Sequence, residues 1–201
     1  MSPAAQHDDD EKLVELCRAG DRIAFDRLVL KYQHLVVGMC TRLVNSAQDG
    51  EDAAQECFVK VYRNLAGFGG ESSFSTWLYR IAVNTCRNYH RSWWGRLSRQ
   101  SVKLDAPRGR DDDDDDGPST DLKDTRFVPV KDLERKRLGA AIESALGELP
   151  QQQREMVVLR DVQGLSYEEI GRITGQTEGT VKSRLFRARG VLQEKLKGVR
   201  S

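Results

Sequence analysis

Apolar side chains recur at helical spacing along most of the chain, and no stretch alternates strictly between apolar and polar positions as a strand would. The pattern predicts helices over residues 11–17, 21–43, 51–65, 73–94, 132–149 and 151–162, then two short helices beginning near Ser166 and Glu178. Gly20, the Gly67–Gly70 turn and Pro150 separate several of them, because Gly and Pro interrupt helices. The sequence therefore predicts an all-α protein.

Helical periodicity stops between residues 96 and 130, where Pro and Gly recur and six aspartates follow one another at Asp111–Asp116. Like charges repel, and a segment with so few apolar residues cannot offset the entropy lost on ordering. We therefore expect a flexible acidic linker over residues 96–130. It would join two small helical domains, residues 9–95 and residues 131–198.

The apolar positions also predict which side chains are buried. They form one face on each expected helix: Phe25, Leu28, Tyr32, Leu35, Val36, Met39 and Leu43; Ala54, Phe58, Val61 and Leu65; Phe74, Leu78, Ile81 and Thr85; Leu133, Leu138, Ile142 and Leu146; Leu165, Ile170 and Ile173. Asp21 is expected to cap the second helix.

The chain has 201 residues and a formal net charge of +1, with 38% hydrophobic and 31% charged residues. Any affinity for nucleic acid must therefore depend on how the cations are distributed. No run of about 18 apolar residues could span a bilayer, and the N-terminus lacks the basic and apolar regions of a signal peptide. We expect a cytoplasmic protein without membrane contact of its own.

The four cysteines, Cys17, Cys40, Cys57 and Cys86, stand apart and form no Cys-x-x-Cys pair. Each lies in an apolar helical context, which favours reduced core cysteines over the alternative of a zinc or redox site. The three histidines are equally scattered. We therefore expect no metal, no cofactor and no catalytic residue.

Residues from Gly164 to Arg189 have the layout of a helix-turn-helix. Ser166-x-x-Glu169 is a capping box that starts the first short helix. Gly175 provides the turn, and Thr177 can cap the second helix.

On this second helix, Val181, Leu185, Ala188 and Leu192 are spaced to face the core, so Lys182, Ser183, Phe186 and Arg187 must point away from it. An exposed Phe among cations suits a major groove, where it can contact a thymine methyl while Arg reads guanine. Lys182, Arg184 and Arg189 are better placed to hold phosphates. The alternative is an ordinary amphipathic helix with a solvated basic face.

Residues 72–104 contain no acid, and Arg80, Asn84, Arg87 and Arg91 form a stripe at spacings of four, three and four. Aromatic residues, Phe68 and Trp77 among them, are interleaved with these cations. Cations along a groove with aromatic platforms are typical of single-strand binding. The alternative is that the aromatic rings are core and the arginines a solubilising face; for Trp77 both remain open.

The block from Phe68 to Asn84, Phe-Gly-Gly-Glu-Ser-Ser-Phe-Ser-Thr-Trp-Leu-Tyr-Arg-Ile-Ala-Val-Asn, resembles the extracytoplasmic-function (ECF) family of bacterial sigma factors. Asp-Ala-Ala-Gln-Glu at Asp52–Glu56 and the helix-turn-helix segment share this resemblance, which covers residues 13–94 and 133–197. It implies a sigma2-like helical bundle and a sigma4-like helix-turn-helix domain.

The resemblance also implies roles and partners. Asp52, Gln55 and Glu56 would dock on the β′ clamp helices of core RNA polymerase, and the β flap is a further expected contact. Promoter DNA would be held at the −10 element by Phe68, Ser72, Trp77, Arg80, Asn84, Arg87 and Arg91, with Asn84 where the family places a base-recognising residue. The −35 element would be read by Lys182, Ser183, Arg184, Phe186 and Arg187. An anti-sigma factor is a further expected partner, and the function requires no enzymatic step.

Three other interpretations stay open. A two-domain regulator acting on duplex DNA would need a sensor pocket or a phosphorylatable aspartate in a βα domain, yet the N-terminal half shows no strand pattern. An enzyme on nucleic acid would need a third carboxylate beside Asp52 and Glu56. A scaffold that binds polymerase without promoter contact would tolerate loss of Arg187.

The Asp111–Asp116 run departs from the family pattern, and it could mimic RNA, avoid DNA or be a plain spacer.

Overall fold

The computed structural model describes the backbone of residues 3–101 and 130–197 and the side chains of residues 9–89 and 135–197. Every element in these two backbone ranges is helical, as the apolar pattern predicts, and neither range contains a strand. The expected flexible linker falls mostly outside the described residues. None of the helices in the described ranges is long and apolar enough to cross a membrane.

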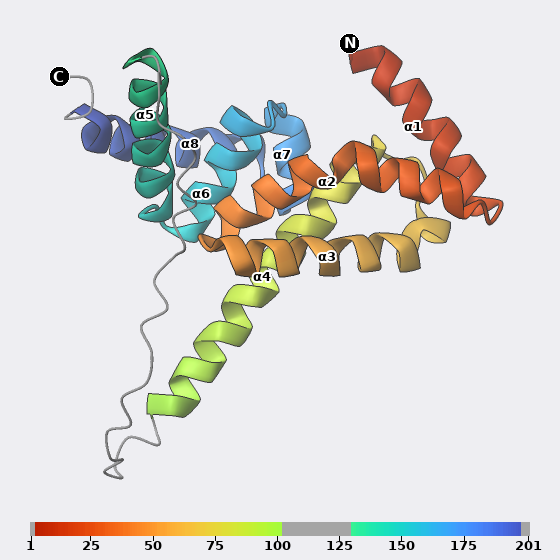
Figure 1. The fold of residues 1–201 in the computed structure, drawn as a ribbon, viewed down its shortest axis with the longest axis horizontal. Coiled ribbons are helices and arrows are strands. Elements are labelled where there is room, and N and C mark those ends of the chain that lie inside the picture. Colours follow the sequence, from red (N-terminus) through yellow and green to blue (C-terminus); the bar gives the residue numbers. More distant parts are fainter. Residues whose placement is uncertain (1–2, 102–129, 198–201) are drawn as a thin grey trace.

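The N-terminal domain consists of α1 (Pro3–Arg18), α2 (Arg22–Val44), α3 (Ala47–Asn64), the 3-10 turn η1 (Leu65–Gly67) and α4 (Phe74–Ser101). Helices α2 and α3 lie antiparallel with the most extensive contact in the molecule, and α4 crosses them (Figure 1). Asp21 caps α2 as expected, because its carboxylate accepts the Ile23 N–H at 2.8 Å. These helices bury most of the predicted face of α2, but Phe25 is only partly buried and Leu35 is 47% exposed.

Three boundaries differ most from the sequence prediction. Helix α1 begins at Pro3 and α4 continues to Ser101, so Gly95 does not end it. Helix α3 begins at Ala47, four residues before the predicted Glu51, since the Ser46 hydroxyl caps it by accepting the Asp49 N–H at 3.3 Å. The break between α2 and α3 is therefore confined to Asn45 and Ser46, where Asn45 adopts a left-handed conformation.

The C-terminal domain consists of α5 (Val130–Gly147), α6 (Gln151–Val157), the π-helical turn η2 (Val158–Val162), α7 (Tyr167–Thr174) and α8 (Glu178–Leu196). Its core includes Leu146, Met156, Leu159 and Ile170. Two predicted core residues of α5 are exposed instead, Leu138 at 42% and Ile142 at 37%. Helix α5 packs mainly against α8 and the end of α2, which leaves one flank of it uncovered.

The two domains pack against each other, which no pattern in the sequence predicted. Helix α7 lies against α4, and α6 lies against α2 (Figure 1). The buried apolar residues of both domains form one continuous cluster. The polar surfaces of the two domains are therefore brought into contact along the α4 helix.

Candidate nucleic-acid and polymerase interface

The outward face of α8 has the composition expected of a recognition helix. Val181, Leu185 and Ala188 are at most 2% exposed, whereas the Phe186 side chain is 82% exposed. Lys182, Ser183 and Arg187 are exposed on the same outward side as Phe186. The predicted orientation of α8 is therefore confirmed. Phe186 is too exposed to contribute to the core, and an exposed aromatic side chain of this size indicates a contact surface.

Local hydrogen bonds position this helix. The Ser166 hydroxyl accepts the Glu169 N–H at 3.2 Å, and the Glu169 carboxylate accepts the Ser166 N–H at 2.8 Å, which completes the predicted capping box. Gly175 ends α7 in the left-handed region with φ of 71°. The Thr177 hydroxyl accepts the Thr180 N–H at 3.3 Å and so begins α8.

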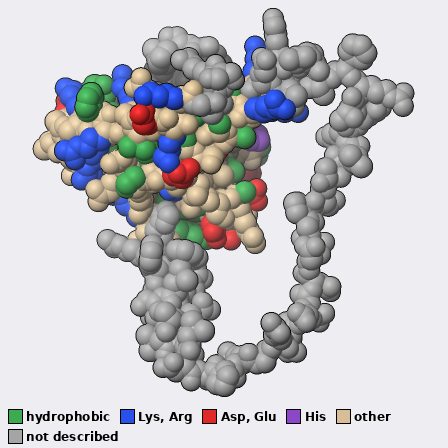
Figure 2. Space-filling view, turned by 90° about the vertical axis from the view of Figure 1, so that its left-hand side faces the viewer, with side chains coloured by type: hydrophobic (Ala, Val, Ile, Leu, Met, Phe, Trp, Pro, Cys, Tyr) green, Lys and Arg blue, Asp and Glu red, His purple; other side chains and the backbone are tan. Residues whose placement is uncertain are grey.

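Neighbouring groups constrain three cations of α8. Lys182 lies 3.3 Å from Glu178 and 5.3 Å above the Tyr167 ring. Arg189 forms two hydrogen bonds with Asp161, and this pairing raises the pKa of the guanidinium. Arg184 is half-buried, with its Nη1 unpaired among the described residues. Figure 2 shows the side of the molecule where α5 and α8 lie, with Lys and Arg side chains gathered over part of it.

The stripe predicted on α4 is only partly exposed. Arg80 and Asn84 face solvent, whereas Arg87 is half-buried and ion-paired across the domain boundary to Glu155. The side chain of Arg91 lies outside the described residues. The opposite face of α4 packs inward as predicted, with Phe74 and Leu78 at most 4% exposed.

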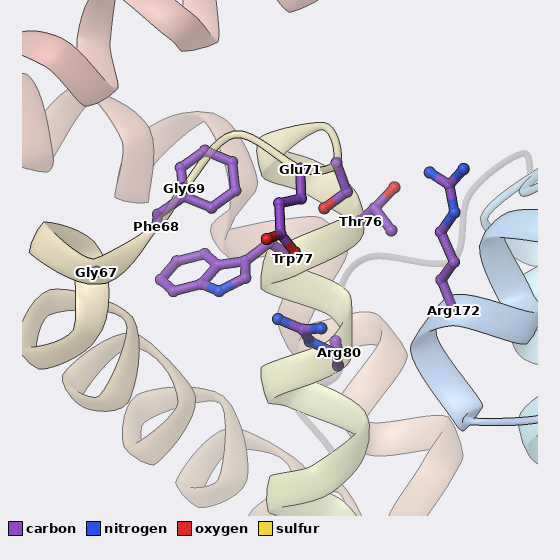
Figure 3. Close-up of a pocket in the computed structure, with 9 residues that line it drawn as sticks. Gly67, Phe68, Gly69, Glu71, Thr76, Trp77, Arg80 and Arg172 are labelled. Atoms are coloured by element: carbon purple, nitrogen blue, oxygen red, sulfur yellow. The ribbon is translucent and has the colours of Figure 1, made fainter.

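Phe68 and Trp77 belong to an aromatic cluster with Phe74. Both are only 8% exposed, and their ring centroids lie 5.1 Å apart. They also form one wall of a cavity of about 420 Å³, which Ser72, Thr76 and Arg80 help to line. Figure 3 shows the Phe68 and Trp77 rings together, Arg80 just beyond the indole, and Arg172 extending from α7 on the side of α4 where Thr76 lies. Both aromatic residues therefore pack as core while their edges border an open site.

The polar face of α3 is exposed at Asp52, Gln55 and Glu56. Lys60 forms an ion pair with Glu56 at 2.7 Å, one turn along the helix. Two apolar side chains on this helix are also exposed, Val59 at 47% and Tyr62 at 53%. The sequence did not predict that these two side chains are exposed, because an apolar residue beside a predicted core face cannot be distinguished from a core residue by its pattern.

Three cysteines meet in the core of the N-terminal domain. Cys40, Cys57 and Cys86 come from α2, α3 and α4 and are at most 1% exposed. A hydrogen bond with Cys40 and burial raise the pKa of the Cys86 thiol, and burial raises that of Cys57. Cys17 is half-buried, and burial raises the pKa of its thiol too. These thiols behave as packed apolar groups, as the sequence predicts.

Four further polar residues lie at the candidate site although none of them was predicted as a site residue: Thr76, Glu155, Glu169 and Arg172. Glu169 was assigned only its capping role, and Glu155 resembles an ordinary solvent-facing residue in the sequence. The one available signal was that Glu155 precedes the apolar run Met156–Leu159, where a charge would be expected to need a partner.

Comparison with known proteins agrees with this arrangement. Residues 28–95 match the family described as Sigma-70 region 2, and residues 139–192 match Sigma-70, region 4. The chain is 39% identical over 196 residues to the RNA polymerase sigma-H factor of Pseudomonas aeruginosa, covering 93% of each. It is 40% identical over 187 residues to the ECF RNA polymerase sigma-E factor of Escherichia coli K12, covering 93% of this chain and 94% of that one.

Two solved structures have a similar fold. The sigma factor RpoE of Bartonella quintana, solved in complex with the anti-sigma factor NepR, is 27% identical with a TM-score of 0.63, covering 86% of this chain and 96% of that one. CnrH, solved with the cytosolic domain of CnrY, has a TM-score of 0.62 over 94% of this chain and 98% of that one; at 23% identity it supports the fold alone.

Two DNA-binding helical domains in the order of regions 2 and 4 define a transcription initiation factor of the sigma-70 type. The chain belongs to the extracytoplasmic-function sigma factors of that family. It binds RNA polymerase and promoter DNA to initiate transcription, and a regulator acting on duplex DNA alone is not favoured.

Proposed function

We propose that the two domains divide promoter recognition between them. The domain at residues 9–95 docks on core polymerase and captures the −10 element, and the domain at residues 131–198 reads the −35 element. The single observation that supports this division best is the 82% exposure of Phe186 on the outward face of α8, which contains Lys182 and Arg187. Such a face suits the major groove, where Arg pairs with guanine and an apolar edge meets thymine.

For the −10 element, the proposed contacts are Phe68, Ser72, Trp77, Arg80, Asn84, Arg87 and Arg91. The exposure of Arg80 and Asn84 beside an aromatic-walled cavity supports strand capture, because an unstacked base needs an aromatic or polar partner outside the duplex. Arg87 is ion-paired with Glu155 of the C-terminal domain.

For core polymerase, the proposed contacts are Asp52, Gln55 and Glu56. They lie within one turn or so of each other on an exposed face of α3, to which Val59 adds apolar area. Such a mixed polar and apolar helix face suits the β′ clamp helices, which the family resemblance names as the partner. The β flap and an anti-sigma factor are further proposed partners, and the Bartonella relative was solved with such a factor.

The mechanism proposed needs no catalytic residue and no cofactor. Binding energy from polymerase and from captured bases offsets the cost of unstacking, a few kcal/mol per base in proteins that extrude bases. The site of action is then the cytoplasm, where bacterial RNA polymerase works.

Run-off transcription with bacterial core polymerase on genomic fragments tests the assignment. Arg187→Ala should remove promoter choice while the chain still co-elutes with core polymerase. Lys195→Ala on the same helix is the matched control, since Lys195 pairs with Glu148 away from the outward face. Equal transcript patterns from both variants would contradict the −35 assignment.

For the polymerase contact, Asp52→Lys should weaken co-elution, and Asp26→Lys should not. Both residues are exposed acids of the N-terminal domain, but Asp26 lies on α2 and outside the proposed docking face. Equal loss in both variants would indicate a nonspecific charge effect and contradict the docking assignment.

A further inference from the structure

Polar groups of the C-terminal domain contact part of the proposed −10 face of the N-terminal domain, at Arg87 and Thr76, while Arg80 and Asn84 stay exposed. Arg87 donates from Nε to Glu155 Oε1 at 3.0 Å and from Nη2 to Glu155 Oε2 at 2.7 Å. Thr76 donates to Glu169 at 3.4 Å, and Arg172 of α7 completes the lining of the cavity walled by Phe68 and Trp77. We infer that the C-terminal domain is an intramolecular partner for the strand-capturing face, and that this closed arrangement must open before promoter melting.

The Glu155 contact has the geometry that Arg uses for phosphate. Two parallel N–H donors engage two oxygens, which is the planar recognition shared by carboxylates and phosphates. The Glu155 carboxylate is 3% exposed, while the Arg87 guanidinium is 31% exposed. A strand phosphate therefore cannot make the same two-point contact with Arg87 while Glu155 holds it. This step rests on the proposed role of Arg87 at the −10 element.

The residue next to Glu155 supplies a second anchor. Arg154, 7% exposed, donates from Nη1 to the carbonyl of Leu43 in the last turn of α2 at 3.2 Å. Its Nη2 donates to the carbonyls of Gly147 and Leu149 at 2.5 and 3.1 Å. One guanidinium thus neutralises carbonyls at the ends of α2 and α5, one helix from each domain.

At the edge of the boundary, a third pair joins the domains. Arg42 of α2 lies 2.7 Å from Glu143 of α5. Together with Glu155 and Arg154, this gives three charged anchors from the C-terminal domain, two at the end of α2 and one on α4.

The charged anchors themselves add little to the net stability of the closed state. Buried ion pairs gain little net stability, because the desolvation cost of each charge nearly cancels its attraction to the partner. Arg154 accentuates this cost, since burial lowers its pKa and its Nε has no partner among the described residues. When the domains separate, water solvates these groups again. Polymerase and the melted strand, which bind only the open form, then shift the equilibrium.

A covalent lock provides the decisive test. A Cβ placed on Gly147 of α5 would lie 3.0 Å from Cγ of Asn45, the residue that ends α2. A disulfide, with its S–S bond of about 2.05 Å, leaves about this distance between one Cβ and the opposite sulfur. Asn45→Cys with Gly147→Cys, in a Cys17→Ser background, should therefore join the domains after oxidation. The remaining native thiols are buried and will not compete.

The full-length locked chain is then tested in run-off transcription with core polymerase after the oxidant has been removed. We expect at least tenfold fewer transcripts from the oxidised than from the reduced protein, and no such difference for the Asn45→Cys single variant. Equal transcription by the oxidised and reduced double variant would overturn the closed-state inference. If wild type and reduced variant both fail to direct transcription, the proposed function fails instead.

A second variant, which weakens the contact between the two domains, should open the free chain. Glu155→Gln removes the charge that holds Arg87, and small-angle scattering of the free chain should show a larger radius of gyration. Glu148→Gln is the matched control, because Glu148 pairs with Lys195 inside the C-terminal domain. A thermal unfolding curve for each variant distinguishes opening from unfolding. An unchanged radius in folded Glu155→Gln protein would argue against the role of this pair.

Discussion

The backbone carbonyl of Gln176 lies 2.7 Å from the position that a Cβ on Gly171 would occupy. Gly171 belongs to α7 and Gln176 to the turn before α8, so this close approach sets how the two helices of the helix-turn-helix meet. The Gly175 and Gln176 N–H groups both donate to the Gly171 carbonyl, at 2.8 and 3.0 Å. No side chain larger than hydrogen fits at Gly171 without moving the turn.

Gly171→Ala is therefore expected to destabilise the protein by about 1–3 kcal/mol, the usual cost of overpacking. Urea unfolding followed by circular dichroism measures this. Gly190→Ala in α8 is the control, since a Cβ there meets nothing within 4 Å. That control should raise stability by about 0.5–1 kcal/mol, because Ala favours helix interiors. Equal behaviour of the two variants would mean that the close approach does not constrain the turn.

Phe186→Ala should separate recognition from stability. The side chain is 82% exposed, so its removal is expected to change the unfolding free energy by less than about 0.5 kcal/mol. Loss of a base contact worth about 1–3 kcal/mol should nevertheless reduce specific transcription roughly tenfold or more. Val191→Ala, at 38% exposure on the same helix, is the matched control. Unchanged promoter use by the Phe186 variant would remove this residue from the recognition face.

Cysteine alkylation should report the buried thiol cluster. Only the thiolate reacts, and burial raises the pKa of the Cys57 and Cys17 thiols. At pH 8, mass spectrometry of the native chain should show slow addition to Cys17 alone, faster as the pH rises, and four additions in urea. Native Cys17→Ser protein should stay unlabelled; labelling of this variant would show that the core opens.

Alkaline pH should weaken the N-terminal domain through Tyr79. Burial, with a further contribution from the charge of Asp10, raises the pKa of Tyr79 from 10.0 to about 12. The fold thus favours the neutral phenol. This contribution to stability is complete below pH 10 and is lost as pH rises from 10 to 12.

Two pKa units at about 1.36 kcal/mol each set an upper value of about 2.7 kcal/mol for this loss. Urea unfolding of wild type and Tyr79→Phe across that range measures it. The Phe variant should lose less stability than wild type between pH 10 and 12. Parallel curves would show that Tyr79 ionises without a conformational cost.

Local signals in the sequence predicted much of the fold. The caps at Asp21, Ser166 and Thr177 and the turn at Gly175 depend on groups within a few residues of each other, so short-range chemistry specifies them. The Ser46 cap of α3 was missed because Asn45 and Gly50 made the segment between them resemble a loop. Periodicity alone also misjudged Leu138 and Ile142, since a helix face is buried only where another element covers it.

The candidate site also has a part that local sequence patterns predicted and a part that they could not predict. The outward direction of Phe186 and Arg187 follows from helical spacing on a single element, and the structure bears out that orientation. The engagement of Arg87 could not be predicted, because Glu155 lies 68 residues further along the chain. No periodic pattern links positions so distant.

What the amino-acid sequence determined by itself is the set of helices, their caps and the polar face of the helix-turn-helix, since these depend on neighbours within one or two turns. Only the tertiary structure decided that Cys40 meets Cys86, that Phe68 and Trp77 wall a cavity, and that Glu155 of the C-terminal domain holds Arg87 of α4. The physical reason is that contacts between distant segments depend on how whole helices pack, and packing is a property of the complete chain.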